Sequence, residues 1–131
     1  MKKHILLIDD DEVVRRLFGS LLGAAGYEVI YAKEANEGRE LARRFQPDLI
    51  LIDKDMPGID GIKASGTLKN EPETANIPIV LFTNSDLSIE AEKWMKEFSI
   101  MDYIQKGIGN EEFIERVKNI FKTIDKNKKT T

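Results

Sequence analysis

Four short, mainly apolar runs in this chain each end on a residue with a charged or hydroxyl side chain. The runs are Ile5–Ile8, Leu49–Ile52, Ile79–Phe82 and Tyr103–Gln105, and the residues that follow them are Asp9, Asp53, Thr83 and Lys106. Aliphatic runs without polar alternation are typical of strands that are buried on both faces of a parallel sheet. If the four runs are parallel strands of one sheet, the four side chains converge at one edge.

The segments around these runs predict a regular alternation of strands and helices. Strands are predicted at residues 5–8, 27–32, 48–52, 77–82 and 100–105, and helices at residues 12–24, 34–45, 61–69, 87–98 and 110–124. In the first helix, apolar residues recur every three or four positions from Val13 to Leu22 and mark one helical face. Because each right-handed crossover packs its helix on one side of the sheet, the pattern predicts an α/β fold with helices on both faces.

The order of the strands decides whether the acidic residues can meet. In a sequential order the first and third strands would lie about 10 Å apart, so Asp9, Asp10 and Asp53 would share a cation only with difficulty. In a doubly wound order 2-1-3-4-5 these two strands are neighbours, and ligands bind in the crevice outside their carboxyl ends. The placement of the acids therefore favours a doubly wound five-stranded parallel sheet of order 2-1-3-4-5.

Length and composition narrow the class of protein. The 131 residues fit one domain, which we predict at residues 1–124, followed by a polar tail at residues 125–131. A net charge of −3 without a basic stripe argues against direct binding of nucleic acid. The chain has no cysteine, which excludes thiolate catalysis and sulfur-bound zinc. No apolar stretch is long enough to cross a bilayer, so we expect no membrane association and a cytoplasmic location.

Three aspartates form the predicted metal site. Asp9, Asp10 and Asp53 would repel one another in a partly desolvated cleft, so either some are protonated or a cation lies among them. Mg²⁺ suits such a site, because it takes oxygen ligands and keeps waters that a phosphate can replace. The plainer alternative is that Asp9 to Glu12 are only N-terminal acids that favour the dipole of the first helix, and it suits Asp11 and Glu12 better than Asp9 and Asp10.

Asp53 is the predicted acceptor of a phosphoryl group. It lies between a buried strand and a turn at Met56-Pro57-Gly58, so it should be reachable. A carboxylate beside Mg²⁺ can act as a nucleophile toward phosphorus. Thr83 and Lys106 could then donate to the equatorial phosphoryl oxygens. Taken alone, each is more simply a strand-end or solvated residue, and only the shared edge gives them this meaning.

Together, these stretches resemble the receiver domains of two-component response regulators, and the similarity covers residues 4–124. The matching motifs are Ile5–Asp11, Pro47–Gly61, Ile77–Thr83 and Asp102–Lys106. The resemblance implies a flavodoxin-like fold and a single-domain signalling switch similar to chemotaxis regulators.

By this resemblance, Asp53 is the phosphoacceptor, and Asp9, Asp10, Asp53 and the backbone carbonyl of Asp55 hold Mg²⁺. Thr83 and Lys106 contact the phosphoryl group, and Tyr103 matches the aromatic residue that swings inward as Thr83 moves toward the phosphate. On its own, an aromatic at the position of Tyr103 would more simply be a core residue.

The resemblance also implies partners and limits on activity. A histidine kinase or phosphotransfer protein donates the phosphoryl group, and the surface of helix 87–98, strand 100–105 and helix 110–124 changes for a downstream protein target. We expect this readout by protein binding because no output domain follows residue 124. The protein is expected not to be an enzyme beyond self-catalysed phosphorylation and dephosphorylation, and to be a monomer or a weak dimer on phosphorylation.

Three residues depart from the usual pattern of the family. Gly107 follows Lys106 where the family usually has a cis-proline, and a cis bond before a non-proline residue costs about 2.5–4 kcal/mol, so we predict a trans bond or a flexible loop. Asn84 follows Thr83 where a small residue is common, and it could restrict the phosphoryl site. Asp55 adds a carboxylate that could orient the hydrolytic water or repel a donor.

Two other functions are compatible with parts of the sequence. Gly107 and Asn84 favour a binding module that keeps the receiver fold but signals without phosphorylation. A small flavin- or nucleotide-binding domain would need a glycine-rich or hydroxyl-rich loop after the first strand, where this chain has the acidic run Asp9–Glu12.

Overall fold

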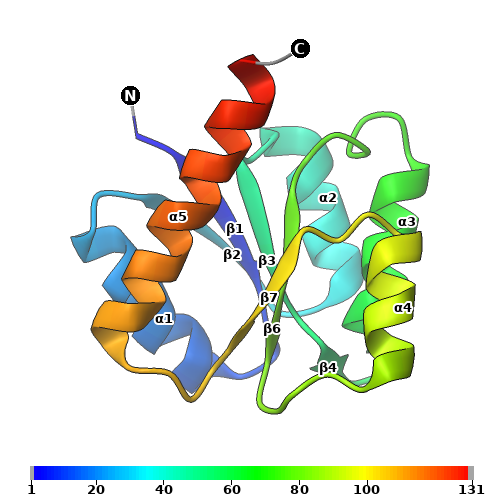
Figure 1. Cartoon of the computed structure of the whole chain (residues 1–131), viewed down its shortest axis with the longest axis horizontal. Helices are drawn as coiled ribbons and strands as arrows, with labels where there is room; N and C mark the ends of the chain where they lie inside the picture. Colours follow the sequence, from blue (N-terminus) through cyan, green and yellow to red (C-terminus); the bar gives the residue numbers. More distant parts are fainter. Residues whose placement is uncertain (1, 130–131) are drawn as a thin grey trace.

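The computed structural model describes residues 2–129 and has one central parallel sheet between two layers of helices (Figure 1). The sheet has the strand order β2-β1-β3-β6-β7. Its strands are β1 (His4–Ile8), β2 (Glu28–Ala32), β3 (Leu49–Asp53), β6 (Ile79–Thr83) and β7 (Asp102–Gln105). All neighbouring strands are parallel, which confirms the predicted doubly wound order 2-1-3-4-5.

Helices cover both faces of the sheet. In Figure 1, α1 and α5 lie on one side of the sheet and α2, α3 and α4 on the other. The helices are α1 (Glu12–Ala24), α2 (Ala35–Phe45), α3 (Gly61–Asn70), α4 (Ile89–Glu97) and α5 (Asn110–Lys129). None of the helices in residues 2–129 is long and apolar enough to span a bilayer.

The two faces of the sheet bury two separate apolar clusters. Along β1, Ile5 and Leu7 pack in the cluster that includes residues of α1 and α5, whereas Leu6 and Ile8 pack in the cluster that includes residues of α2, α3 and α4. Successive side chains of a strand point to opposite faces, so a run with no polar alternation fills both clusters at once. The parallel pairing of β1 with β3 places the carboxyl ends of these two buried strands side by side.

Two features of the chain differ from the predicted elements. The turn predicted at residues 56–58 closes a short antiparallel hairpin of β4 (Asp55–Met56) and β5 (Ile59–Asp60). The predicted helix end at residue 124 is wrong, because α5 continues to Lys129 and includes most of the segment predicted as a polar tail. Asp125 is tied to the body of the protein by an ion pair of 3.0 Å with Lys3. Residues 130 and 131 of the predicted tail lie outside the described part of the chain.

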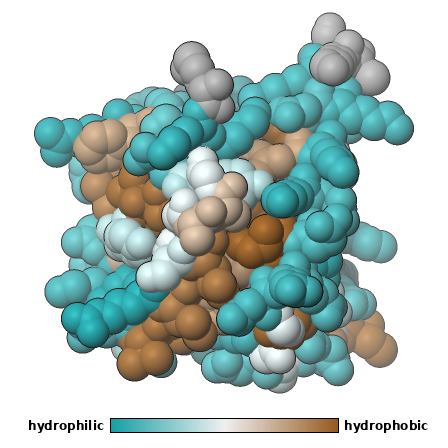
Figure 2. All heavy atoms as spheres, turned by 90° about the vertical axis from the view of Figure 1, so that its left-hand side faces the viewer, coloured by the Kyte–Doolittle hydropathy of each residue, from teal (hydrophilic) through white to brown (hydrophobic). Residues whose placement is uncertain are grey.

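Helix α1 is only partly buried along its apolar spacing. Phe18 and Leu22 are buried, but Val13 and Leu17 are 71% and 47% exposed, so only part of the apolar face predicted for this helix is covered. A wide apolar spacing on a surface helix can exceed the width of the stripe that its neighbours cover. Figure 2 views the side of the molecule that carries α1 and α5 and shows apolar atoms gathered among hydrophilic ones.

Candidate functional site

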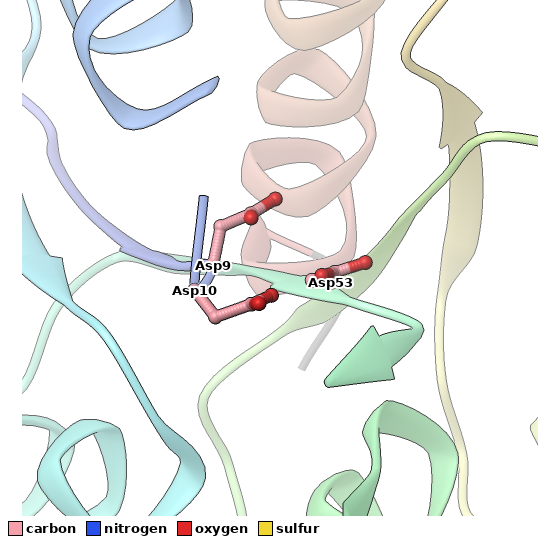
Figure 3. A group of neighbouring side chains, drawn as sticks. All are labelled: Asp9, Asp10 and Asp53. Carbon is pink, nitrogen blue, oxygen red and sulfur yellow. The ribbon is translucent and has the colours of Figure 1, made fainter. Parts of the chain in front are cut away.

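The carboxyl ends of β1 and β3 bring the three predicted metal ligands together. Ile8 is paired with Ile52 in the sheet. Asp9 and Asp53 directly follow these two residues in the chain, so they emerge side by side. One oxygen atom from each of Asp9, Asp10 and Asp53 lies within 4.8 Å of the others. Figure 3 shows Asp9 and Asp10 at the end of one strand with their carboxylates near that of Asp53. Asp9 and Asp53 are buried and Asp10 is exposed, so the cluster has a buried base and an open side.

Lys106 reaches this cluster from the far side of β6. Its Nζ atom lies 2.8 Å from Asp9 Oδ2 and 3.1 Å from Asp53 Oδ1. On the way, the ammonium passes the ring of Phe82 at 5.5 Å from the ring centroid. Burial alone would lower the pKa of Lys106, but the hydrogen bonds and charges of Asp9 and Asp53 outweigh it and raise the pKa, so Lys106 is a cation.

Gly107 does not prevent this contact. All peptide bonds within residues 2–129 are trans, which agrees with the prediction for the Lys106–Gly107 bond. The backbone N–H of Lys106 donates to the carbonyl oxygen of Thr83 at 2.7 Å, which extends the pairing of β7 with β6 by one residue. The strand pairing itself therefore aims Lys106 at the site.

The carboxyl group of Asp53 has an unusual proton affinity. Burial, together with the negative charge of Asp9, raises its pKa to about 6. The positive charge of Lys106 and the hydrogen bond from the backbone N–H of Asp55, at 3.1 Å, oppose this rise only in part. Asp53 is therefore a carboxylate near neutral pH whose negative charge is incompletely compensated, as expected of a group that accepts a cation or an electrophile.

The backbone around Asp53 is held by close contacts with the start of α3. The backbone N–H of Gly61 donates to the carbonyl oxygen of Lys54 at 2.6 Å. A side chain at Gly61 would collide with the carbonyl oxygen of Asp53, so this close approach requires glycine. The carboxylate of Asp55 points elsewhere: it is 66% exposed and lies 3.3 Å from Lys54 Nζ. Asp55 is thus partly neutralised by its neighbour at the rim of the site.

Thr83 and Tyr103 lie near the site but their side chains are engaged with other groups. The buried hydroxyl of Thr83 donates to the carbonyl oxygen of Ser85 at 3.1 Å and accepts from the backbone N–H of Ser85 at 3.2 Å. Asn84 between them is exposed. Tyr103 is half-buried and packs against the apolar cluster beneath α3 and α4. In this state the Thr83 hydroxyl binds its own loop.

Two residues next to the cluster have separate roles, and one of them was not predicted. Asp11 caps α1, because its side chain accepts a hydrogen bond of 2.9 Å from the N–H of Val13, so the plain alternative is correct for this acid. Arg15 was missed: its Nη1 atom donates to the carbonyl oxygen of Asp9 at 2.6 Å. The available signal was an arginine one helical turn beyond the acidic run, where a long side chain can reach back to the strand end.

The residues of the cluster fit a hydrated divalent cation. Carboxylate oxygens are the ligands that Mg²⁺ prefers, and the exposed side of Asp10 leaves room for its waters. Asp9 Oδ2 is buried and makes no hydrogen bond of standard geometry, although Lys106 lies 2.8 Å from it. We take this contact as an ion pair that leaves the oxygen with unused capacity. The donor set therefore suits Mg²⁺ better than a softer metal.

Comparisons with known proteins found a matching family model and related sequences. The family model of the response regulator receiver domain matches residues 5–118. The polar-differentiation response regulator DivK of Brucella anthropi is 33% identical over 119 residues, which cover 91% of this chain and 96% of the relative.

Solved structures show the same architecture. A putative response regulator from Chloroflexus aurantiacus has a TM-score of 0.81 at 32% identity, covering 92% of this chain and 98% of that chain. A CheY-like receiver domain from Methanospirillum hungatei has a TM-score of 0.87 at 23% identity, covering 97% and 99%, and this likeness shows the fold alone.

Proposed function

Because the chain belongs to the response regulator receiver domain family, with a signalling role in two-component systems, we propose that it is a phosphorylation switch whose acceptor is Asp53. The observation that supports this most is the position of Lys106, within 3.1 Å of both Asp9 and Asp53. A cation aimed at a buried carboxylate is the arrangement that a transferring phosphoryl group needs. The protein is a phosphoacceptor in this proposal, with no catalysis beyond its own phosphorylation and dephosphorylation.

The transfer step follows from the groups present. A carboxylate oxygen of Asp53 attacks the phosphorus of a phosphohistidine, the P–N bond breaks, and its electron pair returns to the imidazole of the donor. Lys106 pairs with the phosphoryl oxygens and leaves part of its contact with Asp53. Asp9, Asp10, Asp53 and the carbonyl oxygen of Asp55 would hold Mg²⁺, which would neutralise charge on the transferring group.

The change spreads from the site through Thr83. Its hydroxyl gives up the hydrogen bond to the carbonyl oxygen of Ser85 and donates to a phosphoryl oxygen instead, so the loop between β6 and α4 moves with it. Tyr103 lies on the neighbouring strand β7 and follows into the space that the loop leaves. The surface of α4, β7 and α5 thereby changes for a downstream protein.

The partners of this switch are proteins. A histidine kinase or phosphotransfer protein has to approach the edge of the sheet that holds Asp53, and the exposed apolar side chains of Val13 and Leu17 on α1 offer it a surface to bury. Direct contact with nucleic acid is not part of the proposal. The proposal includes a cytoplasmic location and a monomer that dimerises weakly on phosphorylation.

The rate of phosphorylation should depend on pH through Asp53. Only the carboxylate is nucleophilic, and its pKa in the folded protein is about 6. With a small donor and low Mg²⁺, the initial rate should be level above about pH 7 and fall about tenfold per pH unit well below pH 6. Phosphoprotein formed in stopped time courses is the measurement, with circular dichroism to check that the fold persists. A rate that stays level down to about pH 5 would contradict the raised pKa.

Incubation with acetyl phosphate and Mg²⁺, followed by mass spectrometry, tests the proposed function. We expect the mass of one phosphoryl group to be added, to be located on Asp53, and to require Mg²⁺. No gain in mass, in a protein that still binds Mg²⁺, would favour the phosphorylation-independent binding module that Asn84 and Gly107 suggested.

A further inference from the structure

Arg15 makes a contact that the proposed transfer does not use directly. Its guanidinium donates to the carbonyl oxygen of Asp9 at 2.6 Å. That carbonyl belongs to the peptide unit that joins Asp9 to Asp10, the two acids that follow β1. The orientation of this peptide plane sets the direction in which the Asp10 side chain leaves the backbone, because the plane moves as one rigid unit.

The position of Arg15 in α1 explains how it reaches this carbonyl. Arg15 is one turn into the helix, and its backbone N–H donates to the carbonyl oxygen of Asp11 at 3.0 Å. Side chains of a helix tilt toward its N-terminus, so a long side chain at this position extends back over the loop between β1 and α1. Arg15 is half-buried, whereas its neighbour Arg16 is 80% exposed and pairs with Glu12 at 3.4 Å.

The other polar groups of Asp9 are already held. Its N–H donates to the carbonyl oxygen of Ala32 at 3.0 Å, its Oδ1 accepts from the N–H of Asp11 at 2.9 Å, and its Oδ2 faces Lys106. The Asp9 carbonyl is thus the remaining polar group of this residue, and the hydrogen bond from Arg15 stops its peptide plane from rotating.

We propose that Arg15 is a positioning residue for the cation site: its guanidinium fixes the peptide plane between Asp9 and Asp10 and so holds the two carboxylates in the geometry that a divalent cation needs. This inference rests on the proposed function in assuming that the cluster binds Mg²⁺. Groups that orient metal ligands without touching the metal typically contribute about 10–100-fold to metal affinity.

The direction of the change in Mg²⁺ affinity distinguishes a positioning role of Arg15 from a purely electrostatic one. Removing a positive charge beside a cation site should tighten Mg²⁺ binding, because it removes a repulsion. Losing the anchor of the Asp9–Asp10 peptide should weaken it. The variants Arg15→Met and Arg16→Met carry the same chemical change on adjacent residues, but only the first loses the contact with Asp9.

Isothermal titration with Mg²⁺ measures the first readout. We expect Arg15→Met to raise the Kd at least about tenfold, Arg15→Lys to raise it less because an ammonium can still donate, and Arg16→Met to leave it unchanged or slightly lower. An Arg15→Met variant that binds Mg²⁺ as tightly as the wild type, or more tightly, would overturn the proposal.

Amide hydrogen exchange in the metal-free protein measures the second readout and does not depend on Mg²⁺. The N–H of Asp11, which donates to Asp9 Oδ1, should exchange at least about tenfold faster in Arg15→Met and at the wild-type rate in Arg16→Met. Unchanged exchange in Arg15→Met would also count against positioning. If the wild type binds no Mg²⁺, the metal site of the proposed function fails and the positioning role fails with it; faster exchange in Arg15→Met would then show only that Arg15 orders the loop.

Discussion

Replacing Asp53 by asparagine is expected to abolish labelling of the protein by acetyl phosphate in the presence of Mg²⁺. The amide cannot act as the nucleophile, and the other two carboxylates of the cluster have different surroundings: Asp9 is fully buried against Lys106 and Asp10 faces solvent. We expect the labelled fraction to fall below detection, measured by intact-protein mass spectrometry. The matched control is Asp11→Asn, whose carboxylate caps α1 outside the cluster of three acids and whose replacement should leave labelling intact. Persistent labelling of Asp53→Asn would remove the acceptor role from this residue.

The same substitution should make the metal-free protein more stable. The pKa of Asp53 is raised from 3.8 to about 6, so the charged form is disfavoured in the folded protein, and the neutral amide avoids this at neutral pH. A difference of this size corresponds to about 1–3 kcal/mol in the free energy of unfolding. Because the folded state takes up the proton first, the contribution of Asp53 to stability improves as the pH falls from about 7 to about 4. The difference between Asp53→Asn and the wild type in urea unfolding should therefore shrink over this range. A difference that grows on acidification would contradict the raised pKa.

Addition of Mg²⁺ should raise the midpoint of thermal unfolding. The folded protein brings three carboxylates within 4.8 Å of one another, and the unfolded chain does not hold them together, so the cation binds the folded form. At a concentration tenfold above the Kd, the gain in the free energy of unfolding is about 1.4 kcal/mol. Differential scanning calorimetry at increasing Mg²⁺ is the measurement, with Asp10→Ala as the principal variant. We expect Asp10→Ala to lose most of the increment and to unfold at a higher midpoint than the wild type without metal, because one repulsive charge has been removed.

A neighbouring acid provides the control for this effect. Asp11 caps α1 and is not among the three clustered acids, so Asp11→Asn should retain the full increment with Mg²⁺. A midpoint of the wild type that does not move at about 10 mM Mg²⁺ would count against a metal site at this edge of the sheet.

Much of the site could be predicted because strand ends are readable in the sequence. Leu49–Ile52 is a run without polar residues, and Asp53 is the first acid after it. Such a run has to be buried on both faces, so the residue after it has to emerge at the edge. The same reasoning placed Asp9 and Lys106 correctly, and the need for the acids to meet selected the strand order that the structure shows.

Other features depended on contacts between distant segments. The exposure of Val13 and Leu17 could not be predicted, because the apolar spacing of α1 does not show how much of that face the neighbouring elements cover. The end of α5 was predicted too early, because the polar residues beyond residue 124 gave no sign that the helix continues. In the structure, Asp125 in this continuation forms an ion pair with Lys3. The contact of Arg15 with Asp9 was missed because a helical spacing does not show to which carbonyl a long side chain will donate.

The sequence by itself determined the alternation of strands and helices, the edge of the sheet at which the acids and Lys106 gather, and the residue types that meet there. These follow from local periodicity and from the rule that parallel strands present their carboxyl ends together. Only the tertiary structure decided the proton affinity of Asp53, the pairing of Lys106 with two carboxylates, and the loop contacts of Thr83. These depend on burial and on distances of a few ångströms between side chains far apart in the chain, and electrostatic interactions in a partly desolvated site change steeply with both.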